Sequence, residues 1–234
     1  MKIKNGMKIL GAISVLLVIF SVIIGRITEK SYIDNVELDQ YLANPSVTVA
    51  YYGMGYDPVT NRGYVDNDQV QCIADLMRND VVVVKAKLNG KFQRKLYYEC
   101  ILSQIDIVKC YSGDLEEGDR VNVFEPVDCG FTDQMLCVDG YSLLQPDKEY
   151  ILFLKTLKNT YFGKGKYVYA PISTRYGKYQ VGDHNPKLFS YEELEEPESL
   201  RLYSEVKDQE VYLYEKDEYD KFLELKSEVM EKYE

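Results

Sequence analysis

Histidine is almost missing from this sequence of 234 residues, and tryptophan is absent. The single histidine, His184, lies in the segment VGDHNPK, where the Asn-Pro pair indicates a turn. Beside Asp183, it has the surroundings of a base oriented by a carboxylate. There is no second histidine for a zinc site, however, and the patterns H-E-x-x-H and G-x-S-x-G do not occur. We therefore expect no catalytic residue, no metal ligand and no cofactor-binding residue.

Cysteine is scarce, and its spacing is not that of a metal site. No C-x-x-C occurs, and the five cysteines are Cys72, Cys100, Cys110, Cys129 and Cys137. Because the number is odd, at least one thiol stays unpaired within a single chain. Cys129 and Cys137 enclose the short segment CGFTDQMLC and form the candidate disulfide, with free thiols as the alternative. No cysteine precedes Cys72, so nothing near the N-terminus offers a thiol for lipid attachment.

The chain has no excess of basic charge: acidic residues outnumber basic ones, and the net charge is −10. Residues 191–234 contain 16 acidic and 6 basic residues, whereas the rest of the chain contains 22 of each sign. An acidic excess repels phosphate backbones, so we expect no nucleic-acid partner. The strongest counter-argument is a basic strip around an Asn-Gly turn, formed by Lys85, Lys87, Lys91, Arg94 and Lys95. We expect this strip to be a solvated hairpin tip, or a contact for an acidic partner or the acidic tail.

Charge is also absent from residues 9–25, ILGAISVLLVIFSVIIG, which follow lysines at positions 2, 4 and 8. As a helix, these 17 residues span about 25 Å, the short end of the range for a bilayer. The lysines favour an N-terminus inside the cell and a C-terminus outside. We predict a single-pass protein of the cell membrane with an uncleaved signal anchor and an extracytoplasmic remainder.

A cleaved signal peptide and a buried core helix are the alternatives for this segment. Cleavage needs a small-x-small site, and Ile23-Ile24-Gly25 is a poor one because Ile23 is large. The apolar block also exceeds the usual length of a signal-peptide core.

The chain changes character several times along its length. We predict a basic cytoplasmic tip (1–8), a transmembrane helix (9–25), a membrane-proximal region (26–79), a β-barrel domain (80–182) and an acidic C-terminal segment (183–234).

Two helices are expected outside the predicted membrane span. The first, near residues 68–78, follows from one apolar face made by Val70, Ile73, Ala74 and Met77. The second, near residues 216–232, has an apolar stripe that Lys226 interrupts; the stripe consists of Tyr219, Phe222, Leu223, Met230 and Tyr233. A short strand is expected before it, at residues 211–214.

Strand signals dominate residues 80–182. The segment DVVVVKAKLNGKF is rich in β-branched residues and ends in an Asn-Gly turn, and EYILFLK is apolar on successive positions, so both its faces should be covered. Residues 95–111 read as one long strand whose apolar phase shifts by one residue, which indicates a bulge. Five or six strands with this spacing suit a small antiparallel barrel or sandwich. The predicted fold class is α+β, mainly antiparallel β.

Three blocks, DVVVVKAKLNG, YECILSQIDIVKCYSGDLEEGDRVNVFEP and LLQPDKEYILFLK, resemble a netrin-like or tissue-inhibitor-of-metalloproteinases-like module. The resemblance covers about residues 80–182 and implies an OB-like barrel with an extracellular binding habit. The resemblance does not imply that this chain inhibits proteases. Inhibitors of that family reach the metal through a mature N-terminal cysteine, and the N-terminal segment here contains none.

Together these features predict a membrane-anchored module that binds a protein, peptide or glycan. An extracytoplasmic enzyme and a structural component of an envelope complex are the alternatives. Tyr51, Tyr52 and Tyr56 are the candidate binding face, and packing within the β-domain is the alternative role for these tyrosines.

Overall fold

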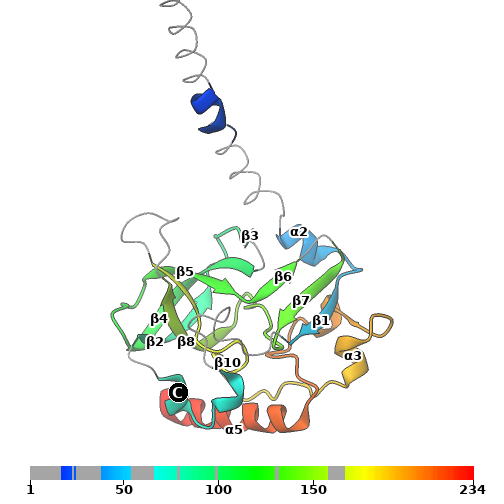
Figure 1. Ribbon diagram of the computed structural model, residues 1–234. Helices are drawn as coiled ribbons and strands as arrows, with labels where there is room; N and C mark the ends of the chain where they lie inside the picture. The colour runs from blue at the N-terminus through cyan, green and yellow to red at the C-terminus, as the bar shows by residue number, and fades with distance from the viewer. Residues whose placement is uncertain are drawn as a thin grey trace, which may run out of the picture. The chain divides into compact units, whose positions relative to one another are not determined.

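The computed structural model describes residues 17–22, 24, 38–53, 66–77, 80–97, 100–129, 132–157 and 167–234. The chain divides into two compact units, residues 1–36 and 37–234. The second unit has mixed α and β structure, with α5 (Lys216–Tyr233) at one end and α2 (Leu38–Ala43) at the other (Figure 1).

A closed five-stranded barrel forms the centre of the second unit. Its strands, in ring order, are β2 (Val81–Leu88), β4 (Cys100–Ser112), β5 (Arg120–Glu125), β9 (Val168–Pro171) and β8 (Glu149–Leu157). The pairing of β8 with both β2 and β9 closes the ring. All neighbours are antiparallel except β5 and β9, which are parallel. This arrangement is consistent with an OB-like barrel. The prediction of a mainly antiparallel barrel is therefore confirmed.

The valine run in β2 is explained by burial on both faces of the strand. Val82 and Val84 pack in the barrel interior, in a cluster with Ile105 and Leu152. Val81 and Val83 belong to the cluster that α5 covers, together with Phe153, Phe222, Leu225 and Val229. Strand β8 is likewise buried on successive positions, as its unbroken apolar sequence predicts. β10 (Lys178–Gln180) pairs with β8 and extends the surface that packs against α5.

A second sheet of four strands adjoins the barrel. Its order is β11 (Arg201–Leu202), β1 (Thr48–Tyr52), β7 (Gln134–Val138) and β6 (Val127–Cys129). β1 and β7 are parallel, and the other two pairs are antiparallel. The sheet therefore draws strands from the predicted membrane-proximal region, the barrel segment and the acidic C-terminal segment. The remaining helices are short: α3 (Tyr191–Glu195) and α4 (Tyr203–Val206).

The C-terminal helix occurs where it was predicted, but its buried face differs from the predicted stripe. Phe222, Leu225, Lys226 and Val229 are the buried residues of α5. Lys226 was expected to interrupt an apolar stripe, and instead it lies inside, paired with a buried carboxylate. The preceding strand predicted at residues 211–214 is reduced to two isolated bridges, Tyr141 with Val211 and Leu188 with Leu213.

The helix predicted near residues 68–78 is wrong. Two 3₁₀ turns occupy this region, η1 (Asn67–Gln69) and η2 (Ile73–Leu76). Val70 and Cys72 between them have extended backbone, so no continuous helix forms. Val70, Ile73 and Leu76 are buried, whereas the expected Ala74 and Met77 are exposed. Tertiary contact with α5 in the shared core replaces a helical face here.

The single long strand predicted at residues 95–111 is also wrong. β3 (Lys95–Tyr97) folds back on the start of β4, pairing Leu96 with Ile101. β4 keeps a regular register against β5 from Ile101 to Asp106. Its irregularities lie further along, opposite β2, between Val83 and Val84 and between Lys85 and Ala86. A bulge in this strand is therefore confirmed, but not at the predicted place.

Of the predicted membrane span, only residues 17–22 and 24 are described, and they are helical. Across the described parts of the chain, no helix combines the length and the apolar character needed to cross a membrane.

Candidate functional site

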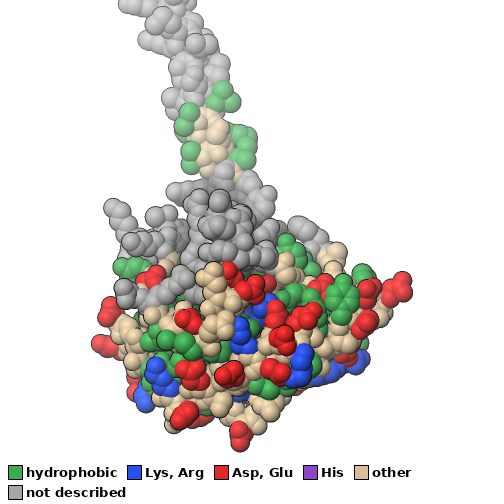
Figure 2. Space-filling model, turned by 60° about the horizontal axis from the view of Figure 1, so that its bottom comes forward, with side chains coloured by type: hydrophobic (Ala, Val, Ile, Leu, Met, Phe, Trp, Pro, Cys, Tyr) green, Lys and Arg blue, Asp and Glu red, His purple; other side chains and the backbone are tan. Residues whose placement is uncertain are grey.

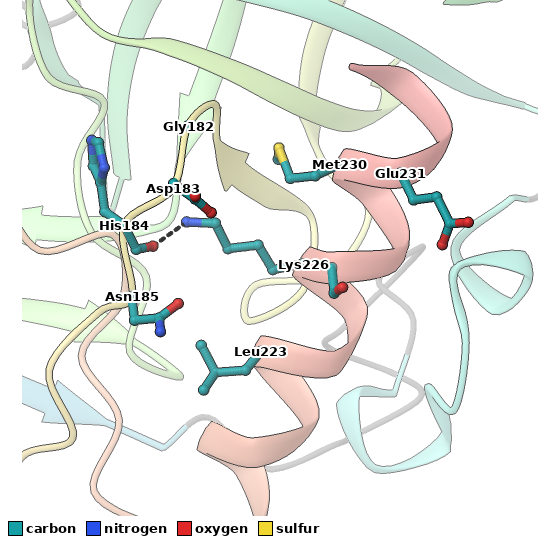
Figure 3. Close-up of a pocket in the computed structure, with 9 residues that line it drawn as sticks. Gly182, Asp183, His184, Asn185, Leu223, Lys226, Met230 and Glu231 are labelled. Atoms are coloured by element: carbon teal, nitrogen blue, oxygen red, sulfur yellow. Dashed lines mark hydrogen bonds between the residues drawn. The ribbon is translucent and has the colours of Figure 1, made fainter.

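A pocket of about 380 Å³ opens between α5 and residues 182–185 (Figure 3). Asp183, His184 and Asn185 line one side, and Leu223, Lys226 and Met230 of α5 line the other. Its lining includes His184, the only histidine of the chain, so this pocket is the candidate site for acid–base chemistry.

The pairing of Asp183 with His184 that a catalytic base would need is not formed among the described residues. The imidazole of His184 points away from α5 in Figure 3, and the carbonyl oxygen of His184 accepts a hydrogen bond from Lys226 Nζ at 2.6 Å. No hydrogen bond joins the Asp183 carboxylate to the imidazole in the described structure. His184 therefore contributes its backbone to the pocket, as its position in a turn predicts.

Lys226, which lines the pocket, belongs to a buried ion pair. Its Nζ lies 2.5 Å from Glu210 Oε2, and both side chains are less than 10% exposed. The second carboxylate oxygen of Glu210 accepts from the backbone N–H of Gln180. Burial raises the pKa of Glu210, and the neighbouring Lys226 opposes that rise. Because both groups are satisfied within the protein, the pair supports the fold and offers no free base to a ligand.

A second buried cation, Lys178, lies deeper in the same polar interior. Its Nζ donates to the carbonyl oxygen of Ser142 at 2.5 Å and to the hydroxyl at 2.8 Å. It also lies 4.5 Å from the centre of the Tyr141 ring. Complete burial lowers the pKa of Lys178 to about 8, although Glu125 and Glu210 act in the opposite direction.

This lowered pKa predicts how stability depends on pH. Below about pH 8, both the folded and the unfolded state hold the proton, and the folded state bears the full cost of a buried cation. Between pH 8 and the ordinary value of 10.5, the unfolded state binds more protons, so stability rises with pH. Relative to Lys178→Met, we expect the free energy of unfolding to rise by about 2 kcal/mol from about pH 7.5 to about pH 9.5. Urea titrations of both proteins at each pH check this; parallel pH profiles would contradict it.

The outer face of β4 and β5 presents a different kind of surface. Leu102 lies opposite Phe124, Gln104 opposite Asn122, and Asp106 opposite Arg120. Alternate residues of a strand share a face, so these three pairs point the same way. The intervening residues, such as Ile105 and Val123, are buried in the barrel. We call Gln104, Asn122, Asp106 and Arg120 the β4–β5 polar face.

A row of amide groups crosses this face. Asn89, in the turn after β2, donates from Nδ2 to Gln104 Oε1 at 2.8 Å. Gln104 Nε2 donates in turn to Asn122 Oδ1 at 3.1 Å. All the bonds run in one direction, so each polarises the next. The Nδ2 group of Asn122, at the end of the row, donates to no other described residue. Asn122 as a whole is partly exposed.

An ion pair lies next to the amide row. Arg120 Nε is 3.0 Å from Asp106 Oδ1, with the Arg120 side chain 61% exposed and that of Asp106 29% exposed. Arg120 retains further N–H donors and Asp106 a second oxygen. The β4–β5 polar face thus offers donors and an acceptor within a short distance, and its two charges cancel.

The structure describes two of the three tyrosines predicted as a binding face. Tyr51 is half-buried; its hydroxyl accepts from Arg175 Nη2 at 2.8 Å, and its ring meets Tyr214 edge-on. Tyr52, the next residue of β1, is 51% exposed. Tyr56 lies outside the described residues. Tyr51 therefore packs in the domain and Tyr52 is exposed, and the binding face stays a prediction.

Cys129 and Cys137, the predicted disulfide pair, are buried free thiols on the adjacent strands β6 and β7. Cys129 lies opposite Met135, and Cys137 lies opposite Val127. The two cysteines are thus diagonal neighbours on one face of the hairpin. Burial raises the pKa of both thiols, which keeps them protonated and unreactive here. Their pairing stays a prediction.

The basic strip is not a single solvated surface. Arg94 is buried and lies 3.5 Å from Glu125, so its expected place at a hairpin tip is wrong. Lys85 lies 3.1 Å from Glu149 and 3.8 Å from Glu234. Glu234 belongs to the acidic tail, so the second contact is the one named as an alternative to a solvated hairpin tip. Figure 2 shows acidic and basic side chains interspersed over the face turned forward.

No family model matches this chain, and the comparison with curated proteins found no match. The β4–β5 polar face was not identified from the sequence. The alternation in SQIDI does place Gln104 and Asp106 on one side of a strand, but Asn89, Asn122 and Arg120 join them only through the strand register.

Proposed function

We propose that the protein is a single-pass membrane protein that displays its barrel outside the cell and binds a protein, peptide or glycan there. The β4–β5 polar face is the binding site of this proposal. The observation that carries it is the partly exposed end of the amide row at Asn122, beside the self-neutralised Asp106–Arg120 pair.

Two further considerations support the proposal. The uncharged block at residues 9–25 behind three lysines favours an anchor with its C-terminus outside. By analogy at the level of the fold, OB barrels bind ligands on their second and third strands, and these correspond to β4 and β5 here. The finer assignment to the netrin-like group is also a proposal, supported by the strand ring and the three sequence blocks.

The membrane part of the proposal predicts a defined topology. Protease added to intact cells should remove the epitope around Glu234 while a cytosolic control protein stays intact. Alkaline carbonate should leave the chain in the membrane pellet. An epitope that survives in intact cells but not in lysed ones, or a chain released by carbonate, would contradict the anchor or its orientation.

The binding part predicts that capture depends on the β4–β5 polar face. Affinity capture from intact membranes with the native chain should enrich a specific ligand, and Gln104→Ala together with Asn122→Ala should reduce that enrichment at least about tenfold. The matched control is Gln40→Ala, which removes an exposed amide from α2. Equal capture by the three proteins would exclude this face as the binding site.

A further inference from the structure

We infer that the ligand of the β4–β5 polar face is a neutral oligosaccharide, an inference that rests on the function proposed above. That function leaves a protein, a peptide and a glycan open as ligands. The chemistry of the face and the position of its strands within the ring decide among them.

The hydrogen-bonding groups suit sugar hydroxyls. A hydroxyl both donates and accepts, and neighbouring hydroxyls of a sugar present these roles side by side. Asn122 Nδ2 and the free N–H groups of Arg120 are donors, and the second oxygen of Asp106 is an acceptor. The amide row fixes the orientation of Asn122, because its Oδ1 is already held by Gln104. Little side-chain entropy is therefore lost when a ligand binds.

An extended peptide fits this face poorly. Peptides that add to a sheet need an exposed strand edge with unpaired backbone groups. β4 pairs with β2 and β3 on one edge and with β5 on the other, and β5 also pairs with β9. Because the backbone groups of β4 and β5 pair within the ring, it is the side chains that are available for recognition over most of this face.

A folded protein partner is also disfavoured. Protein interfaces are anchored by exposed aromatic or aliphatic side chains that fill pockets. The apolar pair on this face, Leu102 and Phe124, is only 4% and 8% exposed. Phe92, half-buried at the turn that carries Asn89, packs against the same cluster.

Polyanions are the remaining alternative, and the carboxylate of Asp106 opposes them. Arg120 of the face is held by Asp106, Arg94 of the nearby basic strip is buried, and the exposed Lys87 lies opposite Asp106 on β2. Binding a charged chain would require breaking the Asp106–Arg120 pair, or repelling the ligand from Asp106. A neutral ligand bears neither cost.

The test uses the full-length chain in lipid nanodiscs and a panel of neutral cello-, malto-, chito- and xylo-oligosaccharides. Heparin-derived oligosaccharides and single-stranded DNA serve as anionic probes. We expect at least one neutral oligosaccharide to bind by calorimetry, with an affinity that changes little with salt. Asn122→Ala and Asp106→Asn should each weaken it at least about tenfold, whereas Gln40→Ala should leave it unchanged. Unchanged melting temperatures of the variants show that the fold is intact, and Arg120→Gln replaces any variant that fails this check.

The outcomes separate this inference from the proposed function. Absence of binding to every neutral member at millimolar concentration, or binding only to the anionic probes with steep salt dependence, would overturn the oligosaccharide. If a captured protein nevertheless depends on Gln104 and Asn122, the proposed function stands with a different ligand. If no captured ligand depends on them, the proposed function itself fails.

Discussion

Replacing Lys226 with methionine is expected to lower the free energy of unfolding by about 3–5 kcal/mol, because it leaves the buried Glu210 carboxylate without its cation. It also removes the hydrogen bond to the His184 carbonyl oxygen, which ties residues 182–185 to α5. Urea titration of the full-length protein in detergent, followed by circular dichroism, measures the loss. Tyrosine fluorescence is a second probe, undisturbed by tryptophan because the chain has none.

The double variant Glu210→Gln with Lys226→Met is expected to recover at least half of that loss, because no charge remains buried without a partner. Lys216→Met is the matched control. It removes the cation of an exposed pair with Asp220 on the same helix and should change stability by less than about 1 kcal/mol. Equal losses for Lys226→Met and Lys216→Met would show that the buried pair contributes no more than a surface pair.

Replacing Glu125 with alanine is expected to cost about 3–5 kcal/mol as well, because this carboxylate serves three partners inside the barrel. It accepts from the Ser103 hydroxyl and from the Leu144 N–H at 2.6 Å, and it lies 3.5 Å from Arg94. Its side chain is fully buried. Alanine would leave the Arg94 guanidinium uncompensated and the Leu144 N–H unpaired.

Arg94→Met combined with Glu125→Gln should restore at least half of this loss, since the amide still accepts from Leu144 and the Arg94 cation is no longer buried without its carboxylate. Glu149→Gln is the control: that carboxylate pairs with Lys85 but is 40% exposed, so its loss should cost less than about 1 kcal/mol. A Glu125→Ala protein as stable as the Glu149→Gln protein would contradict the role assigned to this group.

The strands of the barrel were predictable because their signals are local. The valine run of β2 and the unbroken apolar sequence of β8 indicate strands buried on both faces, and each lies in the ring. Leu144, which precedes β8, is 1% exposed. The C-terminal helix was predictable from a 3.6-residue period over 18 residues. This signal is long enough to predict the helix even though the position of Lys226 was predicted wrongly.

The errors share a physical cause, because each depends on contacts between distant residues. The apolar alternation of residues 95–111 would be the same in one long strand and in a hairpin of two strands. Which of the two forms depends on which edge of β4 is free to pair, and here β3 pairs with it. A lysine or an arginine in the sequence looks exposed until a carboxylate far along the chain is known to meet it. Glu210 meets Lys226, and Glu125 meets Arg94, across 16 and 31 positions respectively.

By itself, the sequence determined the barrel segment, the two-sided burial of β2 and β8, the C-terminal helix and the location of the acidic charge. These follow from composition and short-range periodicity, which act over one turn or one strand. Only the tertiary structure decided how the ring closes, that Lys226 and Arg94 lie inside, and that Asn89, Gln104 and Asn122 form one row. A hydrogen-bonded row across separate strands depends on register, and register is set by the packing of the whole barrel.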